Sequence, residues 1–380
     1  MNQVILTASF LVPLILSVVI LYNSQNDRPK RIMGWSMVNT AAVFIANYFY
    51  FLGEFHVYQY FHSLHVALVL FIYPSIYIYV LYLTQQVRNR RMLFIHFIPG
   101  LFFLLLYFIF FDLKFTADER IEYLSTYRSN SLLSTDKYVL VNVIRMVNVL
   151  AIAGSVIYYS LSIIRASRRF NRKLLAELSN PEKYRIGWLN KSNIALIAVA
   201  IVSVLFYVVD PFSQENNEFL IFSMFLMSIF IWLMGIWGNA QNYIELPAND
   251  DLPVNGKDGE LSISPNESNE LYFKLNELML QQHLYRRSDL KLDELARQIG
   301  TNRSYLSKAI NQHSGVNFNQ FVNQYRINEV QKSVQNGTDI NLDILATEAG
   351  FGSISSFRRA FLTDTGMTPE KWLSKKNSNK

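Results

Sequence analysis

The 380-residue chain contains no cysteine. This absence excludes disulfides, thiolate metal sites, iron–sulfur clusters and cysteine nucleophiles. Charged residues are also scarce, at 17% of the chain, whereas soluble globular proteins carry about 25%. Hydrophobic residues make up 51% of the sequence, with 28 Phe and 22 Tyr. This composition argues against a disordered chain and against one ordinary soluble domain.

Motifs of catalysis and phosphate binding are missing as well. The sequence has no glycine-rich phosphate loop, no kinase motif and no HExxH zinc motif. We therefore predict no catalytic residues, no cofactor and no metal site, and we do not expect an enzyme. Motifs alone would not reveal an active site embedded in a membrane, so that alternative stays open.

Apolar residues are concentrated before about Tyr243. A transmembrane helix needs about 20 mostly apolar residues. Seven segments approach or exceed this length: 4–22, 36–53, 60–83, 92–111, 138–164, 193–210 and 218–240. The first has no basic n-region and no small-residue cleavage site, which favours a retained anchor over a signal peptide. The pattern predicts a seven-helix transmembrane bundle over residues 1–244.

The loops between these segments alternate in charge. The loops after the first, third and fifth segments are basic, and the loop after the fifth has eight Lys or Arg against two Glu. The loops after the second and sixth segments have acidic residues and no Lys or Arg, and the fourth loop is mixed. Basic loops stay in the cytoplasm. We therefore expect a multi-pass protein of the bacterial inner membrane, with its N-terminus outside and its C-terminal region cytoplasmic.

The composition changes again after the seventh segment. Residues 245–265 hold three Pro and two Gly, with five acidic residues against the single base Lys257. No apolar periodicity is present there, which indicates a flexible acidic linker. Residues 266–380 have the composition of an ordinary soluble domain, and we expect them to be α-helical.

The C-terminal region repeats itself. Leu292-Asp-Glu-Leu295-Ala296, followed by Gly300, recurs fifty positions later as Leu342-Asp-Ile-Leu345-Ala346, followed by Gly350. The small Ala allows close helix crossing, and each Gly can take the positive φ of a sharp turn. Each copy therefore predicts a helix-turn-helix unit.

The second helix of each unit has a predicted start and a buried face. Asn302 and Ser353 stand at N-cap positions. Pairs spaced four residues apart would point inward; these are Leu306 and Ile310, and Phe357 and Phe361. The opposite faces would meet DNA in a major groove, unless they are merely solvated. They carry Arg303, Ser304, Ser307 and Lys308 in the first copy, and Ser355, Arg358 and Arg359 in the second.

Between the copies, residues 318–335 are predicted to form one amphipathic helix, roughly 27 Å long at ~1.5 Å per residue. That length suits holding two reading helices about one DNA turn, ~34 Å, apart.

The stretches LDELARQIGTNRSYLSKAI and LDILATEAGFGSISSFRRAFLTDTGMTPEKW carry a family resemblance. The region 267–375 resembles the DNA-binding domain of the AraC/XylS family of bacterial transcriptional regulators. The resemblance implies two helix-turn-helix units bridged by a long helix, with recognition helices Arg303–Gln312 and Ile354–Asp364. It implies structural roles for Ala296, Gly300, Leu306, Ala346, Gly350, Phe357, Phe361 and Pro369. The membrane part resembles, in architecture only, the sensory regions of membrane-anchored members.

Polar residues within the apolar segments are candidates for signal recognition. Asn142, Arg145 and Asn148 follow one another at steps of three in the fifth segment, and Glu54 would be a partner for Arg145. An ionisable residue inside a membrane is by default a functional hypothesis, and the alternative is a polar contact between helices. His62 and His65 allow metal binding or pH sensing, but packed histidines are the more common case.

The sequence therefore predicts a membrane-bound one-component transcription regulator. Its expected partners are double-stranded promoter DNA, the lipid bilayer, RNA polymerase if it activates, a second copy in a homodimer, and a small-molecule or envelope signal. The main alternative is a membrane receptor or transporter-like protein whose tail docks a protein partner. A membrane enzyme with an attached regulator is the third hypothesis.

Overall fold

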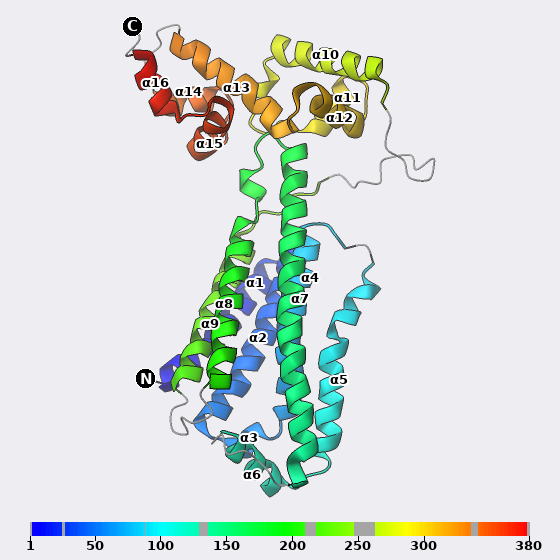
Figure 1. The fold of residues 1–380 in the computed structure, drawn as a ribbon, viewed down its shortest axis with the longest axis vertical. Helices are drawn as coiled ribbons and strands as arrows, with labels where there is room; N and C mark the ends of the chain where they lie inside the picture. Colours follow the sequence, from blue (N-terminus) through cyan, green and yellow to red (C-terminus); the bar gives the residue numbers. More distant parts are fainter. Residues whose placement is uncertain are drawn as a thin grey trace. The chain divides into compact units, whose positions relative to one another are not determined.

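A computed structural model describes residues 2–24, 27–87, 89–128, 136–209, 218–246, 263–335 and 341–377. Within these ranges the regular secondary structure is helical (Figure 1), and the β-pairing consists of one isolated bridge between Leu178 and Lys291. The predicted all-α class is confirmed for this part of the chain. The chain forms two compact units, each built from two stretches of sequence: Met1–Arg168 with Ile186–Gln241, and Arg169–Arg185 with Asn242–Lys380.

The first unit contains a helix at each of the seven predicted segments. Its elements are α1 (Asn2–Asn23), α2 (Arg28–Leu52), α3 (Phe55–Tyr58), α4 (His62–Leu83), η1 (Arg91–Phe97), α5 (Ile98–Tyr107), η2 (Phe108–Asp112), α6 (Ala117–Arg128), η3 (Asp136–Tyr138), the first part of α7 (Val139–Glu177), α8 (Gly187–Val209) and α9 (Glu218–Ala240). Among the described residues, four helices are long and apolar enough to cross a membrane: Asn2–Asn23, His62–Leu83, Arg91–Asp112 and Val139–Glu177. The full set of seven spans remains a prediction.

Several residues on which the predicted topology and the predicted linker depend lie outside the described ranges. They are Arg88 of the third loop, Asp210 and Glu215 of the sixth loop, and most of the linker, 247–262.

Helices of the first unit approach one another closely at glycines. A Cβ atom on Gly100 would lie 2.4 Å from Cε1 of Phe71, and one on Gly238 would lie 2.6 Å from Cε of Met33. Small residues at helix contacts let the backbones pack tightly, as is common between membrane helices. The outward faces of α1, α5 and α7 carry large apolar side chains, for example Ile15, Phe102 and Leu150. A helix on a soluble protein presents polar residues there instead.

The second unit is organised around one long helix, α13 (Phe318–Gln335). Before it come η4 (Glu182–Tyr184), α10 (Pro265–Gln281), η5 (Leu284–Arg286), α11 (Leu292–Gln298) and α12 (Arg303–Ser314), and after it α14 (Leu342–Glu348), α15 (Ile354–Thr365) and α16 (Pro369–Asn377). The bounds of α13 are those predicted from the sequence. Phe321 and Val322 of α13 pack into a core with α10, α11 and α12. Ile327 and Val330 pack into a second core with α14, α15 and α16. The helix therefore joins two small cores.

Candidate nucleic-acid interface

Each of the two cores contains a helix-turn-helix unit, α11–α12 and α14–α15. The turns use left-handed glycines, with φ of +75° at Gly300 and +94° at Gly350. The predicted N-caps are confirmed: Asn302 Oδ1 accepts from the backbone N–H of Tyr305 at 2.9 Å, and Ser353 Oγ accepts from that of Ser356 at 3.2 Å. These local signals start each second helix at the residue that the repeat predicts.

The side chains expected to support the two helix-turn-helix units lie in the interiors of those units. Ala296, Leu306, Ala346, Phe357 and Phe361 are buried. Pro369 is also buried and opens α16, where the missing N–H of proline has no cost. The opposite faces of α12 and α15 are therefore those left to meet a partner.

The candidate face of α12 is partly covered. The Arg303 side chain is only 11% exposed, and its Nη1 lies 3.3 Å from Oε1 of Glu177 at the end of α7. Ser304, Ser307 and Lys308 are half-buried. The structure thus places Arg303, a DNA-contact candidate of the first helix-turn-helix unit, in an ion pair with another part of the chain.

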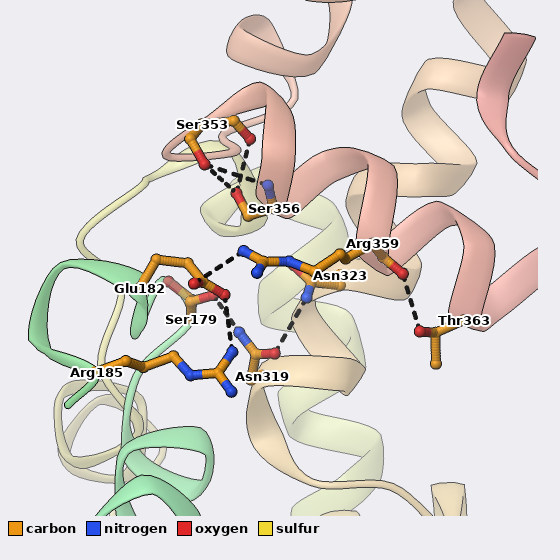
Figure 2. A network of polar contacts seen from close by, with 9 residues as sticks. All are labelled: Ser179, Glu182, Arg185, Asn319, Asn323, Ser353, Ser356, Arg359 and Thr363. Atoms are coloured by element: carbon orange, nitrogen blue, oxygen red, sulfur yellow. Dashed lines mark hydrogen bonds and ion pairs between the residues drawn. The ribbon is translucent and has the colours of Figure 1, made fainter. Parts of the chain in front are cut away.

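The candidate face of α15 is more open, but both of its arginines are paired. Ser355 is exposed. Arg358 Nε lies 2.9 Å from Oε1 of Glu370 on α16, so this pair links two elements of the same core. Arg359 Nη2 lies 2.9 Å from Oε2 of Glu182, while its side chain stays 57% exposed (Figure 2).

Both Glu177 and Glu182 belong to a stretch that we call the docking segment, Leu174–Arg185. It comprises the last turn of α7 and the residues that follow it, and it packs with the C-terminal residues in the second unit. The sequence predicts only that this stretch belongs to a basic loop between two expected spans. Its role in the interface gave no local signal, because its partners lie more than one hundred positions further along the chain.

The electrostatics of Glu177 reflect its burial. Desolvation raises the pKa of its carboxyl group, and the nearby Arg303 and Lys173 lower it by less. Asp293 adds to the increase, since a like charge disfavours the ionised form. The free-energy cost of burying the ionised Glu177 carboxylate is therefore larger than the stabilisation that Arg303 and Lys173 provide.

A second feature that sequence reasoning missed is Arg326 on α13, which is fully buried. Its Nε donates to the carbonyl of Tyr285 at 2.6 Å and its Nη2 to that of Arg287 at 2.9 Å. Its guanidinium also lies 5.6 Å from the ring centre of Phe351. Burial lowers its pKa to about 9, so the group stays charged at neutral pH. The sequence did contain an indication that Arg326 is buried, because position 326 lies midway between the core residues Val322 and Val330 at helical spacing.

The polar candidates on α7 of the first unit face inward. Asn142 Oδ1 accepts from the hydroxyl of Tyr123 at 3.2 Å, Arg145 is half-buried and Asn148 is buried. Glu54 is exposed at the start of α3. His62 and His65 both form hydrogen bonds through Nδ1 to the hydroxyl of Tyr58, at 3.1 and 2.8 Å. Among the described residues, no cluster of three or more metal-ligating side chains is present.

Comparisons with known proteins bear on the second unit. Residues 295–375 match the protein-family profile described as a helix-turn-helix domain. An uncharacterized HTH-type transcriptional regulator of Staphylococcus aureus (strain COL) is 33% identical over 99 residues, which cover 26% of this chain and 13% of that protein. The uncharacterized HTH-type transcriptional regulator YtdP of Bacillus subtilis (strain 168) is 32% identical over 91 residues, covering 24% of this chain and 12% of that protein.

The chain thus spans about an eighth of the length of the curated relatives that it matches. No solved structure matches it. The geometry and these similarities agree on one conclusion: the C-terminal region of this chain contains a helix-turn-helix domain like those of HTH-type transcriptional regulators.

Proposed function

We propose that this chain is a membrane-bound transcription regulator, in which a helical membrane unit controls sequence-specific binding of promoter DNA by the C-terminal domain. The observation that carries the proposal is the pair of helix-turn-helix units joined by α13, each with an arginine on the face of its second helix opposite the buried core residues. Such helices enter the major groove and read base edges there. Arg303 and Arg359 are the residues that we assign to DNA contact, with Ser304, Ser307, Lys308 and Ser355 beside them.

The membrane part of the proposal rests on the first unit. Four apolar helices there have the length needed to span a bilayer, and their outward faces are apolar. The alternation of basic loops supports a cytoplasmic C-terminal domain in the bacterial inner membrane. Under this proposal the polar residues Asn142, Arg145 and Asn148 of α7 belong to the part of the bundle that responds to the signal.

The test is selection of duplexes from a random-sequence library with the full chain held in lipid nanodiscs. We expect enrichment of sites with two short boxes about one DNA turn apart. Affinity for the enriched duplex should fall steeply between 50 and 200 mM salt, because bound phosphates release counterions. Arg303→Ala and Arg359→Ala should each relax one box, at about 1–3 kcal/mol if the side chain contacts bases.

Lys332→Ala is the matched control, since this exposed cation lies on α13 and not on a reading helix. It should change affinity much less than either arginine variant. If no duplex is enriched, and binding is equally weak for all three variants, the DNA-binding proposal is wrong. A protein partner for the tail would then be the better hypothesis.

A further inference from the structure

The docking segment places a carboxylate against the assigned arginine of each helix-turn-helix unit. Glu177 pairs with Arg303 at the start of α12, and Glu182 pairs with Arg359 in α15. We propose that the docking segment is a built-in competitor of DNA, which must leave these two arginines before a duplex can bind. This inference rests on the proposed function, because it concerns the regulation of the same surface.

The segment is held by more than its charges. Its backbone pairs with the strand-like residues before α11, where Ser179 N donates to the carbonyl of Leu290 at 3.1 Å. The carbonyl of Ser179 accepts from Nδ2 of Asn319 on α13 at 2.6 Å (Figure 2). Leu174 and Leu178 are buried. The segment is therefore packed and hydrogen-bonded as part of the second unit.

Asn180 connects the segment to both helix-turn-helix units. Its Nδ2 donates to the carbonyl of Ser288, before α11, at 2.7 Å and to that of Gly350, in the turn after α14, at 3.1 Å. Its Oδ1 accepts from the backbone N–H of Gly352 at 3.3 Å and from Nη1 of Arg326 at 3.2 Å. The side chain of Asn180 thus links the turn of the second helix-turn-helix unit to the loop before the first helix-turn-helix unit.

The carboxylate oxygens of Glu177 and Glu182 offer the arginines the same kind of acceptor as the phosphate oxygens of DNA. Guanidinium groups bind carboxylate and phosphate oxygens in the same way. Arg303 is nearly buried against Glu177, so it cannot touch a duplex while that contact persists. Arg359 is more exposed, but its contact with Glu182 must also be exchanged for one with DNA. Occupancy of both arginines, rather than the strength of either pair, is the basis of the competition.

The segment is also directly continuous with the first unit. Helix α7 contributes residues up to Arg168 to the first unit and Arg169–Glu177 to the second. The same helix carries Asn142, Arg145 and Asn148. A signal that favours a different state of α7 would therefore change the stability of the docked contacts without an intervening linker, which is the differential effect that a switch requires.

The cleanest test locks the segment with a disulfide. A Cβ atom at Gly352 would lie 3.6 Å from Cβ of Asn180, within the range of about 3.5–4.5 Å found in disulfides. The chain has no other cysteine, so Asn180→Cys with Gly352→Cys forms a single defined pair. We expect the oxidised full chain in nanodiscs to bind the enriched duplex at least tenfold more weakly than the same sample after reduction. Each single cysteine variant, given the same oxidant, is the control.

A second variant loosens the segment instead. Asn180→Ala removes the hydrogen bonds to Ser288, Gly350, Gly352 and Arg326. We expect it to bind the duplex about tenfold more tightly than the unmodified chain, a change of the size that a few lost hydrogen bonds produce. Asn328→Ala, at an exposed position of α13, is the matched control and should leave affinity unchanged.

The outcomes separate this inference from the proposed function. Equal binding by the oxidised and reduced cysteine pair, with binding still dependent on Arg303 and Arg359, would overturn the competition alone. Absence of duplex binding by the unmodified chain, the reduced pair and Asn180→Ala would overturn the proposed function and the inference with it. Tighter binding of the enriched duplex by Asn180→Ala than by the unmodified chain, and by the reduced pair than by the oxidised pair, would support both.

Discussion

The guanidinium of Arg326 donates from Nη1 to Oδ1 of Asn180, 3.2 Å away. Through this contact the helix that joins the two helix-turn-helix cores is bonded to the segment that follows α7. Arg326 has no carboxylate partner among its hydrogen bonds, which go to Asn180, Asn323 and the carbonyls of Tyr285, Arg287 and Ser179. The charge is therefore balanced by oriented dipoles rather than by an acid.

Replacement of Arg326 should destabilise the second unit. Arg326→Met leaves the carbonyls of Tyr285 and Arg287 buried without this donor, and Arg326→Lys cannot span them with one ammonium group. We expect losses of about 2–4 kcal/mol, measured by hydrogen exchange of peptides from α13 in the full chain. Lys332→Ala, on the same helix and exposed, should exchange like the unmodified chain. Unchanged protection in both Arg326 variants would contradict this account.

The two turn glycines should differ in their tolerance of a side chain. A Cβ at Gly350 would lie 2.4 Å from the carbonyl oxygen of Arg286, whereas a Cβ at Gly300 has nothing within 4 Å. Both residues have positive φ, which costs an alanine about 1–2 kcal/mol. Gly300→Ala should lose about that amount in a denaturant titration, and Gly350→Ala should lose clearly more. Equal losses would show that the close approach to Arg286 has no energetic weight.

Removal of the N-cap side chains should weaken helices α12 and α15. Asn302→Ala and Ser353→Ala each remove an acceptor for a backbone N–H at a helix start, which typically costs about 1 kcal/mol. The expected readout is faster hydrogen exchange in the first turns of α12 and α15, respectively. Ser355→Ala is the control, since Ser355 lies two residues after Ser353 and is exposed. It should show no such change.

The docked state should depend on pH through Glu177. Because burial raises the pKa of this carboxyl above its ordinary value of 4.5, the docked form binds a proton more tightly than the released form does. The proton-linked stabilisation of docking is therefore complete below the ordinary value and is lost as the pH rises through the raised one. Acidification from pH 7 to pH 5 should favour docking and weaken duplex binding by the unmodified chain.

Glu177→Gln removes this titration, so it should show a smaller decrease in affinity over the same pH range. Glu270→Gln is the control, since Glu270 pairs with Lys274 on α10 and does not contact the docking segment. Identical pH profiles for the unmodified chain and Glu177→Gln would contradict the role given to this carboxyl group.

The proposed membrane topology can be checked with single cysteines, because the chain has none of its own. Glu54→Cys lies between the second and third predicted segments, at the predicted outer side, and Lys30→Cys lies between the first and second, at the predicted cytoplasmic side. In intact cells, a membrane-impermeant maleimide should label the first variant strongly, and the second only after the membrane is opened. Labelling of both before the membrane is opened, or of Lys30→Cys alone, would reject the orientation.

The sequence by itself determined most of the long elements of this protein, whereas the short helices α3 and α6 lie in stretches expected to be loops. Apolar segments predicted the long helices, the internal repeat predicted two helix-turn-helix units, and α13 begins and ends at the predicted residues. Asn302, Ser353, Gly300 and Gly350 are at the positions that their types favour. These features follow from interactions within a few residues, such as caps, turn conformations and helical periodicity, and such interactions leave a local pattern.

Only the tertiary structure decided which charges meet. Arg303 and Glu177 are 126 positions apart, and Asn180 bonds to Gly350 across 170 positions. No periodicity or motif connects residues at such distances, because their contact depends on how whole helices pack. The sequence predicted which arginines would contact DNA, and the fold showed that carboxylates of the same chain pair with them.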